Sequence, residues 1–163
     1  MKACSVSLVL HFLVLCTAFA QKEAGTLSES EVNAFLTQFD SAHTSAGEIA
    51  ELPQYFANGA TCISDVLDFE KSKWSLACSD VQSYAVKAKE FIGDVANAAL
   101  RREKSKLALS KDKTWAAIES KVTYAATTKD GTKYEVACVQ LLVVCVENRK
   151  LKIKSIWMRA VEG

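Results

Sequence analysis

The sequence predicts an α+β fold, in which N-terminal helices pack on an antiparallel β-sheet. Three observations carry this prediction. Apolar residues recur every three or four positions through much of the first hundred residues, which is the period of an amphipathic helix. From about residue 104 the period falls to two, the alternation of a half-buried strand. Turn signals such as Asp130-Gly131 divide this second part into successive strands. Helices gathered on one side of such a sheet define the α+β class.

Two helical segments are expected at the start of the domain. Ser28 and Glu31 have the spacing of a capping box, so the first helix begins at about residue 29. Its apolar stripe is interrupted at Gly47. A second, short helical segment continues the pattern, and Pro53 marks a bend or a new start within it.

A short strand and a third helix follow. Residues 57–65 contain a turn and then a strand, whereas residues 66–78 are expected to be irregular or to form a small hairpin. Ser79 and Gln82 repeat the capping-box spacing, which predicts a helix whose apolar side reaches Val95. The later strands are expected at 106–110, at 114–128, between the turns at Asp130-Gly131 and Glu147-Asn148-Arg149, and from there to about Val161.

The first twenty residues are expected to be a secretory signal peptide. Lys2 gives a short basic start, an apolar stretch runs to Cys16, and Ala18 and Ala20 suit a signal peptidase. A membrane anchor is the alternative, but the apolar stretch is short for the ~20 residues that span a bilayer. Residues 21–163 then form a single secreted, extracellular domain with no membrane segment in the mature form.

The composition argues against several classes of function. Without Lys2 the chain has 19 basic and 19 acidic residues, and this neutral balance gives no footprint for nucleic acid or an anionic membrane. No clustered histidines and cysteines have metal-ligand spacing. No nucleophile elbow or phosphate-binding glycine loop occurs. We therefore expect neither a metal nor another cofactor.

Four cysteines follow the signal peptide, and two of them lie in one predicted strand. Cys138 and Cys145 are seven positions apart, so their side chains point to opposite faces, and the strand between them spans about 23 Å. A disulfide needs Cα atoms only ~5.5–6 Å apart, so these two do not pair. Two full pairings stay open, 62–138 with 78–145 or 62–145 with 78–138. The favoured interpretation is a single bridge between Cys62 and Cys78, which leaves the other two as buried thiols.

Two stretches resemble one superfamily. Residues 31–65, EVNAFLTQFDSAHTSAGEIAELPQYFANGATCISD, resemble the first helices and first strand of the nuclear-transport-factor-2-like (NTF2-like) superfamily. Residues 127–158, TTKDGTKYEVACVQLLVVCVENRKLKIKSIWM, resemble its final hairpins. The resemblance covers roughly residues 29–161 and implies a cone-like fold, with helices on a curved sheet around a pocket. Ketosteroid isomerases, scytalone dehydratases and polyketide cyclases share this fold.

Cystatins share the plan of a helix on a curved sheet. Their Gln-x-Val-x-Gly inhibitory turn is absent here, and residues 140–144, QLLVV, lie inside a predicted strand instead of a loop. A cystatin-like inhibitor is therefore only the third interpretation.

The strand predicted between the turns at Asp130-Gly131 and Glu147-Asn148-Arg149 is apolar on both faces. A sheet face that meets water should be polar, and an apolar one marks an interface. Members of the NTF2-like superfamily often dimerise back to back through the convex face of the sheet, so the resemblance implies a homodimer. The alternative is that the C-terminal residues or residues 66–78 cover this face. The apolar residues on this second face are Ala137, Val139, Leu141, Val143 and Cys145.

The resemblance also implies candidate site residues. Isomerases of the superfamily use a carboxylate base with a tyrosine, and dehydratases use histidine with aspartate. Asp65 follows the first strand and His43 lies near the end of the first helix, so these two are the candidate catalytic residues. The simpler interpretation, which we favour, is that His43 packs at a helix end or faces solvent and Asp65 forms a turn. The aromatic candidates for ligand binding, each also explicable as core, are Tyr55, Trp74, Tyr84, Tyr124 and Trp157.

The favoured function is thus a secreted NTF2-like protein that binds a small apolar ligand or a protein partner without catalysis. The alternative is an isomerase- or dehydratase-type enzyme that uses Asp65 with His43 or a tyrosine. The two differ in the expected interior. An enzyme needs both side chains in one enclosed cavity, whereas an interior filled with aromatic rings favours interaction through the surface.

Overall fold

A computed structural model describes residues 26–68 and 73–161 of the chain. The side chains of residues 65–77 lie outside the described part, and so does the predicted signal peptide. Within the described ranges, no helix has both the length and the apolar character needed to cross a membrane.

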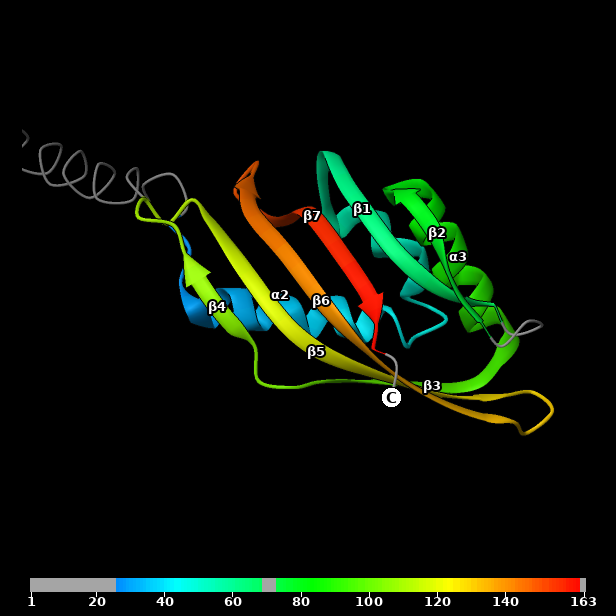
Figure 1. The fold of residues 1–163 in the computed structure, drawn as a ribbon. Coiled ribbons are helices and arrows are strands. Elements are labelled where there is room, and N and C mark those ends of the chain that lie inside the picture. Colours follow the sequence, from blue (N-terminus) through cyan, green and yellow to red (C-terminus); the bar gives the residue numbers. More distant parts are fainter. Residues whose placement is uncertain (1–25, 69–72, 162–163) are drawn as a thin grey trace, which may run out of the picture.

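Two α-helices, one 3-10 helix and seven strands make up the described fold. In chain order they are α2 (Glu29–Ala42), η1 (Ile49–Tyr55), β1 (Phe56–Asp68), β2 (Lys73–Asp80), α3 (Val81–Asp94), β3 (Val95–Arg102), β4 (Lys106–Leu109), β5 (Trp115–Thr128), β6 (Lys133–Glu147) and β7 (Lys150–Ala160). The strands form one sheet in the order β2-β1-β7-β6-β5-β3, and β4 also pairs with β5. The helices lie behind the curved sheet in Figure 1, and the face turned toward the reader carries none. The predicted α+β class is confirmed.

Helix α2 begins where the capping box predicts. The Ser28 hydroxyl accepts a hydrogen bond from the Glu31 N–H at 3.3 Å, and the Glu31 carboxylate accepts one from the Ser28 N–H at 3.0 Å. These two bonds satisfy N–H groups that a helix start otherwise leaves without partners. The buried side of α2 is the predicted stripe, consisting of Val32, Phe35, Leu36, Phe39 and Ala42.

Helix α3 begins one residue later than its Ser79–Gln82 spacing predicts. Its N-cap is Asp80, whose carboxylate accepts a hydrogen bond from the Ser83 N–H at 2.8 Å. Aspartate is as good a cap as serine, so the choice between neighbouring caps depends on where β2 ends. Of the two options for residues 66–78, the hairpin is correct, since β1 and β2 pair antiparallel.

Strand β3 is absent from the sequence-based prediction. Its sequence, VANAALRR, has three alanines and no clean alternation of apolar and polar residues. The segment is extended because it pairs with β5 along its length, with Ala99 opposite Ala125. Strand formation here depends on cross-strand partners more than on the residues themselves.

The sheet is mixed and not wholly antiparallel as predicted. Strand β1 runs parallel to β7, with Cys62 opposite Ile156. The other neighbouring pairs are antiparallel. A parallel pair needs a long connection, and everything between β1 and β7 supplies one here.

The cysteines occupy the places that the strand alternation predicts, but none is bridged. On β6, Cys138 is buried opposite Val122, whereas Cys145 lies on the other face beside Trp115. All four cysteines in the described part are free thiols, so the predicted bridge between Cys62 and Cys78 is absent from the structure. Cys62 and Cys78 both pack in the core as small apolar side chains. Burial raises the pKa of Cys62 to about 12, which leaves its thiol protonated and unreactive.

Candidate functional site

His43 lies at the end of α2 with only 6% of its surface exposed. Its Nδ1 is 2.7 Å from the carbonyl oxygen of Phe39, and a carbonyl can only accept, so Nδ1 carries the proton. The lone pair of Nε2 then accepts a hydrogen bond from the Tyr84 hydroxyl, 2.5 Å away on α3. The ring is thereby held as a neutral imidazole of one defined tautomer.

Burial governs the protonation states around this histidine. It lowers the pKa of His43 to about 4, and the hydrogen bond to Phe39 offsets the shift only in part. Burial, followed by the neighbouring Tyr124 hydroxyl, raises the pKa of Tyr84 well above its usual value. Burial also raises the pKa of Tyr124. The group therefore carries no charge at neutral pH.

Aromatic rings fill the space around His43. Its ring centroid is 4.5 Å from that of Phe39, 5.7 Å from Tyr84 and 6.4 Å from Tyr124, all edge to face. Phe56 packs against Tyr84 at 5.9 Å and against Phe39 at 6.1 Å. Edge-to-face contacts at these distances are favourable and hold the rings in place. The only histidine in the described part thus belongs to a packed aromatic cluster.

An ion pair lies one helical turn before His43. Arg102 on β3 donates from Nε to Asp40 Oδ2 at 2.7 Å and from Nη2 to Asp40 Oδ1 at 2.5 Å. Both side chains are largely buried, with 11% and 15% of their surface exposed. Two buried atoms have no hydrogen-bond partner in the described part, Nη1 of Arg102 and Oε1 of Gln140 on β6. Such orphaned polar atoms are rare in folded proteins.

The sequence-based prediction missed Asp40, Arg102 and Gln140. Asp40 precedes His43 by three residues, which places both on one side of α2, so helical spacing could have found it. Arg102 stands within a run of basic residues that reads as a solvated surface. Nothing local in the sequence identifies its partner 62 positions earlier.

The structure brings together three of the predicted site residues, His43, Tyr84 and Tyr124. Tyr55 lies apart from them, packed against Phe35 and Phe39. Trp157 lies on the opposite face of the sheet, paired with Leu141 and Ile63, so it does not line the interior.

Two further predicted residues lie in the β1–β2 hairpin. Asp65 pairs with Leu76, and Trp74 pairs with Leu67. The side chains of Asp65 and Trp74 lie outside the described part. The predicted pairing of Asp65 with His43 therefore stays a prediction.

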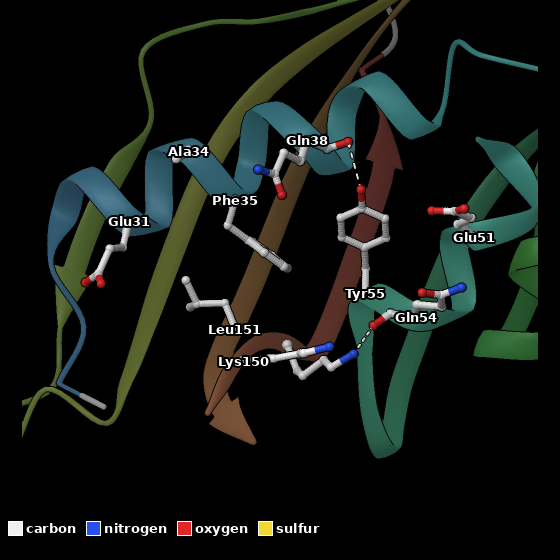
Figure 2. A pocket seen from close by; sticks show the side chains of 10 residues that line it. Glu31, Ala34, Phe35, Gln38, Glu51, Gln54, Tyr55, Lys150 and Leu151 are labelled. Carbon is white, nitrogen blue, oxygen red and sulfur yellow. Dashed lines mark hydrogen bonds between the residues drawn. The ribbon is translucent and has the colours of Figure 1, made fainter. Parts of the chain in front are cut away.

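A pocket of about 460 Å³ opens between α2, η1 and the start of β7 (Figure 2). Phe35 and Leu151 extend toward its middle, and Lys150 lies at one rim. The lining residues are Glu31, Ala34, Phe35, Gln38, Glu51, Gln54, Tyr55, Lys150, Leu151 and Lys152. Among the described residues, no three His, Cys, Asp or Glu side chains gather closely enough to hold a metal ion.

The outer face of the sheet, away from the helices, carries exposed apolar side chains. Ile63, Trp157 and Leu141 form a row across β1, β7 and β6. Trp115 stands beside Cys145 further along. The exposed fractions are 46% for Ile63, 42% for Leu141 and 47% for Trp115. The apolar second face that the sequence predicts is therefore present, and we call it the outer apolar face.

Solved structures with this arrangement are numerous, although neither a family model nor a curated protein matches the chain. A protein from Novosphingobium aromaticivorans described as a scytalone dehydratase has a TM-score of 0.65 at 10% identity, over 82% of this chain and 83% of that one. A protein from Streptomyces avermitilis described as a dehydratase of the NTF2-like family has a TM-score of 0.64 at 11% identity, over 82% and 97%. A Xanthomonas campestris protein described as a calcium/calmodulin-dependent protein kinase II association domain has a TM-score of 0.64 at 16% identity, over 80% and 86%.

Identities this low establish the fold and not the activity. The helices on one face of a curved seven-stranded sheet, together with these neighbours, show that the chain has the NTF2-like fold.

Proposed function

We propose that this chain is a secreted binding protein without catalytic activity, and that it works as a homodimer joined through the outer apolar face. The observation that carries the proposal is the row of Ile63, Trp157 and Leu141 across three strands. Export is supported by the basic, apolar and small-residue pattern of the first twenty residues.

The outer apolar face has the character of an interface. Ile63, Leu141 and Trp115 are each exposed by more than two fifths of their surface. Monomeric proteins seldom leave large contiguous apolar areas in water. A second copy of the chain can cover such a face, because a two-fold axis buries the same residues on both subunits. Aromatic side chains such as Trp115 and Trp157 are typical of interface centres.

The interior supports the absence of catalysis. A general base needs a free lone pair within reach of a substrate proton. The Nε2 lone pair of His43 already accepts the Tyr84 hydroxyl, and aromatic rings surround both groups. The hydroxyls of Tyr84 and Tyr124 have raised pKa values, so neither is a ready base or nucleophile.

Sedimentation velocity on the secreted form tests the dimer. The wild type should sediment as a dimer, and Leu141→Glu should sediment as a monomer because burying a carboxylate in an apolar interface is costly. Val86→Glu is the matched control, since Val86 is 44% exposed but lies on α3, on the helical side. A monomeric wild type at micromolar concentration, or a dimeric Leu141→Glu, would overturn the dimer.

Chemical modification of His43 tests the closed interior. Diethyl pyrocarbonate acylates an accessible neutral imidazole, and His43 is the only histidine beyond residue 11. In the native protein His43 should resist the reagent, whereas in urea it should react, as followed by peptide mass. Rapid modification of the native protein would contradict the closed site.

A second candidate is the enzyme predicted as the alternative, with a small polar molecule reaching the interior. The orphaned Nη1 of Arg102 and Oε1 of Gln140 favour it, because a ligand could supply their missing partners. The same modification experiment separates the candidates, since an interior that admits substrate also admits the reagent.

A further inference from the structure

We infer that the pocket between α2, η1 and β7 binds an amphipathic acid, a molecule with an apolar body and one carboxylate. This inference rests on the proposed non-catalytic binding role, but it does not depend on the dimer. The volume of the pocket, about 460 Å³, lies within the range of small-molecule sites.

Part of the pocket wall is apolar and ordered. Phe35 from α2 and Leu151 from β7 extend toward the same space, and the Tyr55 ring closes one side (Figure 2). The Tyr55 hydroxyl donates to the carbonyl oxygen of Gln38 at 3.3 Å, which links η1 to α2. Its ring also packs against Phe35 at 5.7 Å. A ligand therefore meets a surface that is already ordered, which lowers the entropy cost of binding.

The pocket is separate from the His43 cluster. The Phe39 ring lies between them, 5.6 Å from Tyr55 on one side and 4.5 Å from His43 on the other. Phe39 is fully buried. A molecule in the pocket thus contacts neither His43 nor Tyr84.

The charges around the pocket are placed unevenly. Lys150 is exposed, and its ammonium group has no ion-pair or hydrogen-bond partner among the described residues. Lys152, two positions along the same strand, donates to the Gln54 carbonyl oxygen. The carboxylate of Glu31 is already engaged at the start of α2, where it accepts hydrogen bonds from both the N–H and the hydroxyl of Ser28. Glu51 lies on the far side of the Tyr55 ring from Lys150 (Figure 2).

This distribution selects the ligand. The free ammonium of Lys150 suits a carboxylate, and the neighbouring Phe35 and Leu151 suit an alkyl chain or a ring. A cationic amphiphile would place its charge against Lys150, and a fully polar anion would leave the apolar wall unused. The amphipathic acid matches both parts of the site.

Isothermal titration calorimetry with decanoate below its micelle concentration tests the site. Decanoate should bind, and decylammonium should bind at least about tenfold more weakly, because an ion pair at Lys150 is replaced by repulsion. Lys150→Gln should weaken decanoate binding about tenfold. Lys154→Gln is its control, since Lys154 lies on the same strand but outside the pocket.

A filled pocket provides an independent variant. Ala34 is exposed on α2 and lines the pocket, so Ala34→Trp should abolish decanoate binding without disturbing the core. Asn33→Trp changes the neighbouring exposed position of α2 outside the pocket and should bind like the wild type.

The outcomes separate this inference from the proposed dimer. Leu141→Glu should bind decanoate like the wild type, because the outer apolar face is not the site. Equal binding by Ala34→Trp, equal affinity for decylammonium, or no binding by the wild type would each overturn the inference, whatever the oligomeric state.

Discussion

The hydroxyl of Tyr84 lies 2.5 Å from Nε2 of His43, and this hydrogen bond joins α3 to the end of α2 across 41 positions of sequence. The bond requires an unprotonated Nε2. Protonating His43 would remove the acceptor and would place a cation in a buried site next to the Arg102 guanidinium, where Asp40 supplies the nearby negative charge among the described residues. The contact therefore makes folding sensitive to acid.

Stability should fall as the pH drops from about 6.5 to about 4. The pKa of His43 is lowered to about 4 by burial, so between this value and the usual 6.5 the unfolded chain binds a proton that the folded chain does not. The stabilisation is complete above about pH 6.5 and is lost progressively below it. At about 1.4 kcal/mol per pH unit, the loss reaches about 3 kcal/mol. Urea unfolding at a series of pH values measures it.

The variant His43→Gln provides the comparison for this pH dependence. Glutamine can donate to Phe39 and accept from Tyr84 but does not titrate, so its stability should change little over the same pH range. An equal acid sensitivity in wild type and variant would place the effect in other groups.

Removing the Tyr84 hydroxyl should destabilise the fold. Tyr84→Phe leaves the Nε2 lone pair of His43 buried without a donor, which costs about 1–3 kcal/mol. Tyr55→Phe is the matched change, since its hydroxyl makes a longer, exposed bond to a carbonyl oxygen, and it should cost less. Thermal unfolding of both variants checks the order, and the reverse order would show that the Tyr84 contact contributes little.

The Asp40–Arg102 pair should be sensitive to loss of one partner. Arg102→Met leaves the Asp40 carboxylate largely buried without its two donors, and we expect a loss of about 3 kcal/mol in the free energy of unfolding. The exposed pair of Lys106 and Glu119 is the control, and Lys106→Met should have little measurable effect. Denaturant titration measures both, and similar small effects would mean that water reaches the Asp40 side chain.

The capping box of α2 should contribute measurably to stability. Ser28→Ala removes the side-chain acceptor of the Glu31 N–H and should cost about 1 kcal/mol. Thr37→Ala, on the exposed side of the same helix, should be neutral or slightly stabilising, because alanine has the higher helix propensity. Equal melting temperatures for the two variants would indicate a frayed first turn.

Features encoded by neighbouring residues could be predicted from the sequence. The start of α2 follows from Ser28 and Glu31, three residues apart, and its buried stripe follows from helical spacing. The turn at Asp130-Gly131 follows from residue type, since Gly131 has a φ of +91°, a conformation that glycine adopts readily. The alternation along β6 correctly separated Cys138 from Cys145.

Features that depend on distant partners could not be predicted in the same way. Strand β3 and the parallel pairing of β1 with β7 arise only when the strands meet. In the site, His43 was identified by residue type and by resemblance, but its bond to Tyr84 depends on how α3 packs on α2. The partner of Arg102 likewise depends on the tertiary fold.

The place of β7 between β1 and β6 has a consequence for how the fold is completed. Strand β7 follows all the other described strands in the chain but is an inner strand of the sheet, and the β1–β2 hairpin pairs with the remaining strands only through it. Until β7 has been synthesised, the β1–β2 hairpin and the sheet of β3, β4, β5 and β6 therefore have no strand that pairs with both. A stop codon before Lys150 would remove β7, which is an inner strand and not an edge strand, and would divide the sheet in two.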